Sequence, residues 1–214
     1  MKTTEVDVFL ADIRHQDCEE MAGRLDRNSV ERLVRITHPR RRAQFILGRF
    51  LLRQALRRKY GAVAAEWRLD AASGKPRLVG ADVPEISLSH SRELVACAIA
   101  RVEIGLDVEF CRERDFEALT EQVCSPAELR CFLSFPVSER SARFYRMWTL
   151  KEATFKFFGR EMQPPECSRQ PWARDGYLQY THFQPSEGYL AALVARSGSP
   201  LHPVLNSPLP IEVG

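Results

Sequence analysis

Two separate segments carry charged side chains whose types and spacing could hold a cation and a phosphate. Asp107 and Glu109 lie two residues apart in IGLDVEF, so on a strand their side chains would share one face. Glu152 and Lys156 lie four residues apart in WTLKEATFK, so on a helix they would share one face. Mg²⁺ prefers oxygen ligands, a few carboxylates together with the phosphates of a substrate. The spacing therefore predicts a divalent-metal site with these three carboxylates as ligands and Lys156 beside a phosphate.

Simpler explanations exist for both pairs. Two acids on one face of a strand are commonly solvated, and an exposed Glu–Lys pair on a helix contributes only about 0.3–0.5 kcal/mol. However, the opposite face of IGLDVEF is wholly apolar, and Gly105 permits close approach of another backbone or a ligand. Leu150, Ala153 and Phe155 surround Glu152, so we expect a substantially buried helix on which a charge needs a partner or a metal. We therefore favour the metal site.

Two further segments offer groups that could bind a phosphate. The turn GKP presents Lys75 ahead of Pro76, although such a turn is most often a plain hairpin corner. The segment SLSHS places Ser89 and His90 at the end of a strand, where hydroxyl and imidazole groups are good phosphate anchors. A single histidine at such a place is more often structural.

Hydrophobic periodicity predicts the elements that would position these groups. Apolar residues at helical spacing predict a helix in RRRAQFILGRFLLRQALRRKYG that ends at Gly61, and a second long helix that ends at Gly159. A turn is expected at His90-Ser91. The second helix is predicted at Ser141–Phe158. The predicted strands are Val6–Ile13, Glu85–Ser89, Leu94–Ala100, Ile104–Phe110, Tyr177–Phe183 and Tyr189–Arg196.

An internal similarity indicates two related lobes. ELVACAIAR at 93–101 and GYLAALVAR at 188–196 share an apolar pattern, and a predicted long helix precedes each. We expect an α+β fold of two lobes, each with antiparallel strands packed on a long helix. Residues 1–102 would form the N-terminal lobe, and residues 103–200 the C-terminal lobe with most of the metal ligands. Residues 201–214 are rich in proline and are expected to be a tail, poorly ordered or draped over the surface.

Composition and charge limit the class of protein. The chain of 214 residues is 44% hydrophobic and 28% charged, which is typical of a soluble globular protein. It has no apolar run of the roughly 18–20 residues that span a membrane, and acids interrupt the apolar start, so we expect a cytoplasmic protein. The net charge of +3 is too small to identify a class of partner by itself. However, arginines cluster between Arg24 and Lys59. Such a basic sector attracts phosphates, an acidic protein or nucleic acid.

Four motifs in this order and spacing resemble the 4'-phosphopantetheinyl transferases of the larger, monomeric, Sfp-like class: GKPRL at 74–78, SLSHS at 87–91, IGLDVE at 104–109 and WTLKEATFK at 148–156. The resemblance covers about residues 30–160. It implies a pseudo-twofold α+β chain with coenzyme A between two lobes, and Mg²⁺ on the three carboxylates. It implies that coenzyme A is bound by Arg40, Lys75, Pro76, Ser89, His90 and Lys156. Glu128 falls where the family often has another acid, and Ser87 stands where an asparagine is common.

The resemblance also implies a reaction. A monomeric enzyme would transfer 4'-phosphopantetheine from coenzyme A to a serine of an acidic acyl or peptidyl carrier protein, releasing adenosine 3',5'-bisphosphate. Glu152 would accept the serine proton and Lys156 would neutralise the leaving phosphate. One alternative is a non-catalytic module that binds coenzyme A or a nucleotide, whose signature would be a broken set of acids. A nucleic-acid binder is another, but the chain contains no recognised nucleic-acid motif.

Overall fold

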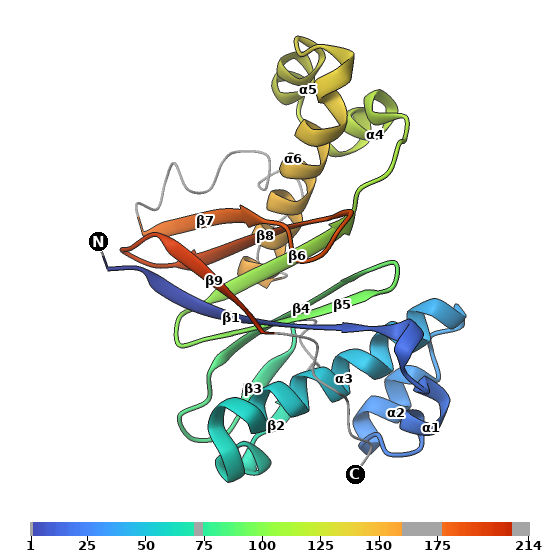
Figure 1. Cartoon of the computed structure of the whole chain (residues 1–214), viewed down its shortest axis with the longest axis vertical. Helices are drawn as coiled ribbons and strands as arrows, with labels where there is room; N and C mark the ends of the chain where they lie inside the picture. The colour runs from blue at the N-terminus through green and yellow to red at the C-terminus, as the bar shows by residue number, and fades with distance from the viewer. Residues whose placement is uncertain (1, 71–74, 160–176, 207–214) are drawn as a thin grey trace.

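The computed structural model describes residues 2–70, 75–159 and 177–206 (Figure 1). The elements in chain order are β1 (Thr4–Asp12), η1 (Ile13–His15), α1 (Cys18–Ala22), α2 (Arg27–Leu33), α3 (Pro39–Tyr60), η2 (Gly61–Glu66), β2 (Arg68–Asp70), β3 (Arg77–Val79), β4 (Glu85–Ser91), β5 (Leu94–Ala100), β6 (Ile104–Phe110), α4 (Phe116–Val123), α5 (Pro126–Leu133), α6 (Val137–Phe158), β7 (Leu178–Phe183), β8 (Tyr189–Arg196) and β9 (Leu201–Asn206).

The strands form two main sheets and a short hairpin. One sheet has the order β4-β5-β1-β9 and the other the order β6-β8-β7, while β2 pairs only with β3. Only the β1–β9 pair is parallel among the described strands. The predicted limits of β5, β6 and β8 are confirmed. The end of β4 was predicted too early: the strand continues through His90 and Ser91, and the turn falls at Arg92, whose φ of 51° is left-handed.

Three apolar clusters hold the layers together. The two sheets share a core in which Val8 and Ala96 of one sheet meet Leu106 and Leu193 of the other. The helix α3 covers the outer face of the first sheet, and α6 covers the outer face of the second (Figure 1). The fold class is confirmed as α+β. Each lobe contains one 22-residue helix, and the predicted ends at Gly61 and Gly159 are confirmed, although α6 begins at Val137 and not at the predicted Ser141.

The segment expected to be a tail differs in part from that expectation. Residues 201–206 form β9, which lies parallel to β1 at the edge of the first sheet. Pro203 is tolerated there because an edge strand can lack one N–H. This part of the chain therefore returns to the N-terminal lobe, whereas residues 207–214 lie outside the described residues. In the parts that the structure describes, no helix has the length and apolar character to cross a membrane.

In the sequence, Asn28 followed by Glu31 resembles a capping box and predicts the start of a helix, but the start of α2 differs. The N-cap is Asp26, not Asn28, and its carboxylate accepts a hydrogen bond from the Ser29 N–H at 2.9 Å. The segment SPAE at 125–128 predicts a capped helix start, and α5 confirms it, with Ser125 as N-cap and Glu128 as its capping-box partner. Pro164, Pro165 and Pro171 predict a loop in the sequence, and they lie outside the described residues.

Candidate functional site

The helix α6 packs unusually closely on β6 at Gly105. A Cβ atom at this position would lie 2.1 Å from the Ala153 carbonyl oxygen and 2.6 Å from the Phe157 nitrogen. Only glycine therefore allows this approach. The close packing brings Lys156 of α6 to Asp107 of β6, where its Nζ lies 2.7 Å from Oδ1.

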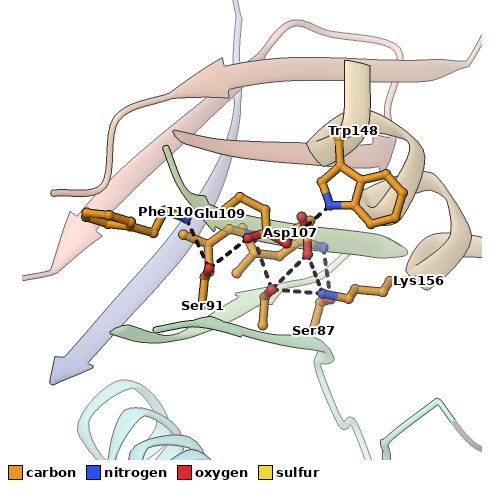
Figure 2. A network of polar contacts seen from close by, with 10 residues as sticks. Ser87, Ser91, Asp107, Glu109, Phe110, Trp148 and Lys156 are labelled. Carbon is orange, nitrogen blue, oxygen red and sulfur yellow. Dashed lines mark hydrogen bonds and ion pairs between the residues drawn. The ribbon is translucent and has the colours of Figure 1, made fainter. Parts of the chain in front are cut away.

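The facing edges of β4 and β6 belong to different sheets and are joined by serine hydroxyls. Three serines, which we call the serine seam, accept hydrogen bonds from successive edge amides of β6: Ser87 from Leu106 at 2.9 Å, Ser89 from Val108 at 3.1 Å and Ser91 from Phe110 at 3.0 Å. Two of the hydroxyls also donate to carboxylates (Figure 2). Ser89 donates to Asp107 at 2.9 Å and Ser91 to Glu109 at 2.7 Å.

Asp107 is a buried carboxylate with one unused oxygen. Its exposed fraction is 4%, and Oδ1 accepts hydrogen bonds from Ser89 and Lys156. Oδ2 is buried and has no hydrogen-bond partner in the described part of the chain. A buried carboxylate oxygen without a partner is costly, so it is suited to accept a cation or a donor from a ligand.

Glu109 is oriented from both sides. Its Oε2 accepts from Ser91 of β4, and its Oε1 accepts from the indole N–H of Trp148 of α6 at 3.2 Å (Figure 2). The Glu109 carboxylate is thus held by one element from each lobe.

Glu152 completes a negatively charged region with Asp107 and Glu109. Burial raises the pKa of Glu152, the charge of Asp107 raises it further, and Lys156 acts in the opposite direction. The carboxylates are therefore near enough to repel one another. They do not form a finished coordination sphere: within residues 2–70, 75–159 and 177–206, no group of three His, Cys, Asp or Glu side chains could hold a metal ion as it stands. The oxygen donors and the unused Oδ2 of Asp107 nevertheless fit a hard cation such as Mg²⁺.

Glu152→Gln is expected to increase stability at neutral pH in metal-free buffer. The pKa of Glu152 is raised above its ordinary value of 4.5, so the folded protein holds this proton more tightly than the unfolded chain does. Stability is therefore lost as the pH rises from 4.5 through the raised pKa, and the loss persists at neutral pH. Glutamine removes the buried charge. Urea denaturation over about pH 4–8 checks this, with the exposed Glu139→Gln on the same helix as control; a gain independent of pH would contradict it.

A cavity of about 420 Å³ lies between α3, β4 and the C-terminal end of α6. Its lining among the described residues contains no Asp or Glu. The basic side chains that line it are Arg32, Arg41, Arg49, Lys75 and Lys156. A cavity with this lining favours an anionic ligand, and several phosphates more than one.

Most of the residues predicted to bind coenzyme A line this cavity, namely Lys75, Pro76, Ser89, His90 and Lys156. Arg40 does not. It is half exposed and lies 3.6 Å from Glu93, while its neighbour Arg41 lines the cavity. Glu128 is used elsewhere, because its carboxylate caps α5 and pairs with Lys151 at 3.0 Å.

Sequence analysis missed the contribution of α3 to the cavity. Arg41, Gln44, Phe45, Gly48 and Arg49 line it at the spacing of one helical face. That spacing is visible in the sequence, but arginines outside the apolar stripe of a helix commonly form a solvated face, so the spacing alone does not predict a cavity. Arg49 is instead half-buried, with its guanidinium 4.7 Å from the centre of the Phe45 ring. Burial, and secondarily the charge of Arg32, lowers the pKa of Arg49 to about 10.

His90 is a neutral part of the lining. Burial, followed by the positive charges of Arg41 and Lys156, lowers the pKa of His90 to about 3. The imidazole therefore carries no charge at neutral pH, and it can offer a ring N–H to a ligand while the arginines and lysines supply the charge.

Fold and site together define a two-lobed α+β protein in which a cationic cavity lies beside one buried and two partly buried carboxylates. Residues 103–193 match the family model described as the 4'-phosphopantetheinyl transferase superfamily. The chain is 32% identical over 148 residues to the 4'-phosphopantetheinyl transferase HetI of Nostoc, a match that covers 66% of this chain and 62% of that protein. It is 26% identical over 136 residues to Sfp of Bacillus subtilis, covering 63% of this chain and 60% of that one.

A further match is to AcpT of Salmonella typhimurium, 33% identical over 118 residues, which covers 54% of this chain and 58% of that one. The chain thus spans less than two thirds of the length of each of these relatives. The motif resemblance is confirmed by these matches: the chain is similar to the 4'-phosphopantetheinyl transferases, in the family model and in relatives that carry this name.

Proposed function

We propose that this protein transfers 4'-phosphopantetheine from coenzyme A to a serine hydroxyl of an acyl or peptidyl carrier protein, with Mg²⁺ as cofactor and adenosine 3',5'-bisphosphate as the second product. The observation that carries the proposal is the place of Lys156. Its ammonium lines the cationic cavity and also lies within 2.7–2.8 Å of Asp107 and Ser89. It therefore joins a region suited to phosphates to a region suited to a metal. The names of the relatives support the same reaction.

Each group has a role in this proposal. Arg32, Arg41, Arg49, Lys75, Ser89 and His90 bind the phosphates of coenzyme A in the cavity. The carboxylates of Asp107, Glu109 and Glu152 hold Mg²⁺, which would neutralise charge on the pyrophosphate when bound. Lys156 contacts the phosphate that leaves, because its ammonium already lies at the boundary of the cavity and the carboxylates.

The transfer also needs a proton acceptor. The serine oxygen of the carrier attacks the phosphorus next to pantetheine, the bond from that phosphorus to the adenosine bisphosphate breaks, and the serine proton must leave. Glu152 accepts it, directly or through a water. A positioned carboxylate is a suitable group for this role, because a serine hydroxyl is a poor nucleophile at neutral pH until its proton is accepted.

The carrier is proposed to be acidic and to meet the exposed basic residues of α3, which include Arg53, Arg57 and Arg58. We further propose that the protein is cytoplasmic and acts as a monomer, the monomeric state being what the resemblance to the Sfp-like class implies. Light scattering after size-exclusion chromatography checks the oligomeric state.

The function is tested with a panel of apo carriers incubated with the protein, coenzyme A and Mg²⁺. Intact-mass spectrometry should find a mass increase of one phosphopantetheinyl group on at least one carrier, and EDTA should prevent it. The same carrier with its acceptor serine changed to alanine is the control. Binding of coenzyme A without modification of any carrier would favour the non-catalytic module.

Arg41→Ala is expected to weaken the binding of coenzyme A by about 10–100-fold, because a charge-assisted hydrogen bond to a phosphate contributes about 1.5–3 kcal/mol. Arg40→Ala is the matched control: the neighbouring arginine pairs with Glu93 outside the cavity. Isothermal titration calorimetry compares the two. Equal losses in both variants would mean that the cavity is not where coenzyme A binds.

A further inference from the structure

The hydroxyl of Ser91 has two partners that together fix its orientation. It accepts a hydrogen bond from the Phe110 N–H at 3.0 Å and donates its only proton to Oε2 of Glu109 at 2.7 Å. The amide and the carboxylate belong to neighbouring residues of β6. Ser91 therefore aligns the Glu109 carboxylate with the backbone that carries it.

The serine seam contains an internal comparison for this arrangement. Ser89 repeats it one step along the strand, with Val108 as donor and Asp107 as acceptor. At Ser87 the hydroxyl accepts from Leu106 in the same way, but the residue that would supply the carboxylate is Gly105. The serine seam thus makes three hydrogen bonds to the backbone of β6 and two hydrogen bonds to carboxylates. Connecting the two lobes and orienting the carboxylates are therefore separable roles.

The backbone around Ser91 is itself fixed by contacts to α3 and β6. Gln44 of α3 is buried, and its amide donates to the carbonyl oxygen of Arg92 at 2.8 Å. The Arg92 guanidinium lies 5.0 Å from the centre of the Phe110 ring. Ser91 is therefore held on a tethered hairpin, which is the rigidity that a positioning group requires.

The second oxygen of Glu109 is oriented from the opposite side, by the Trp148 indole N–H at 3.2 Å. We propose that Ser91 is a positioning residue for Glu109: through its hydroxyl, the N-terminal lobe sets the direction of a carboxylate that belongs to the C-terminal lobe. This inference rests on the proposed function in one respect, namely that Glu109 is a ligand of the divalent cation. Groups that orient ligands in this way typically change metal affinity by about 10–100-fold when removed.

The test compares Ser91→Ala with Ser87→Ala in the full chain. Each variant removes one hydroxyl that accepts from an edge amide of β6, so both are expected to lose a similar amount of stability in urea denaturation. Mn²⁺ binding, measured by electron paramagnetic resonance without coenzyme A, separates the roles. Ser91→Ala is expected to weaken Mn²⁺ binding by about 10–100-fold, whereas Ser87→Ala leaves it unchanged. Ser91→Thr, which retains a hydroxyl, should restore the affinity.

Two results would overturn the inference: Ser91→Ala that binds Mn²⁺ as the wild type does, or equal weakening in Ser87→Ala and Ser91→Ala. The second result would mean that the serine seam affects Mn²⁺ binding only by connecting the two lobes, and not by orienting Glu109. If the wild type itself binds no Mn²⁺ while it is folded, the metal site of the proposed function fails as well. A wild type that binds Mn²⁺ and modifies a carrier, with an unaffected Ser91→Ala, would reject the role of Ser91 alone.

Discussion

Asp107→Asn is expected to lower the rate of carrier modification by about 10²–10³-fold or more, a loss of the size seen when one preorganised electrostatic contact to a transition state is removed. The amide has the same shape as the carboxylate, but it lacks the charge that would hold a cation and that pairs with Lys156 at 2.7 Å. The fold should survive, because the Lys156 side chain is 28% exposed and can turn to water. Initial rates by intact mass at saturating coenzyme A measure the effect.

Glu103→Gln is the matched control for that substitution. Glu103 immediately precedes β6, and its partner is Arg196 in an exposed pair, which contributes about 0–1 kcal/mol to stability. This variant should transfer phosphopantetheine at the wild-type rate. An Asp107→Asn enzyme with the wild-type rate would show that the assignment of Asp107 to the metal is wrong.

Gly105→Ala is expected to destabilise the protein by about 1–3 kcal/mol or to prevent folding, because overfilling a packed contact forces the backbone to move. The added methyl would meet the backbone of Ala153 and Phe157 at 2.1 and 2.6 Å, and neither atom belongs to a flexible side chain. A shift of α6 would also separate Lys156 from Asp107, so any folded variant should lose activity. The midpoint of urea denaturation and the rate of transfer measure the two effects.

Gly48→Ala separates this effect from the general consequence of replacing a glycine. Gly48 lies inside α3, and a Cβ there would meet only the Val95 side chain, at an ordinary 3.6 Å. Alanine should be neutral or stabilise by up to about 1 kcal/mol, since glycine is a poor helix former. If Gly105→Ala were equally harmless, α6 and β6 could not lie as close as the structure has them.

The parts of the fold that sequence predicted best are those with a strong local pattern. LVACAIA and IGLDVEF are apolar or strictly alternating, and both strands have the predicted limits. The end of β4 was missed because a His-Ser pair is also typical of a turn, although the strand continues and Arg92 makes the turn. The strand β9 was missed because its pairing with β1 is almost 200 residues distant in sequence, and the composition of a proline-rich segment does not encode such a partner.

The proximity of the charged side chains was predictable where one element determines the spacing. Alternation in β6 places Asp107 and Glu109 on one face, the four-residue spacing in α6 does the same for Glu152 and Lys156, and the structure brings the two pairs together. The cavity was harder, because it depends on which face of α3 turns toward β4. Arg40 pairs with Glu93, whereas Arg41, the next residue, lines the cavity. Periodicity alone did not determine which of the two arginines lies on the face of α3 toward β4.

The serine seam has a consequence for how the two lobes could move apart. If backbone hydrogen bonds joined β4 to β6, the two strands could separate only if a sheet were disrupted. Hydrogen bonds from serine hydroxyls can break while both sheets keep their own backbone hydrogen bonds. The amide hydrogens of Leu106, Val108 and Phe110 would then meet solvent first. The amides of Gly105, Asp107 and Glu109 alternate with them, face β8 and would stay protected. Deuterium uptake at the amides of Leu106, Val108 and Phe110 would therefore report transient separation of the two lobes, and the protein would need no attached label.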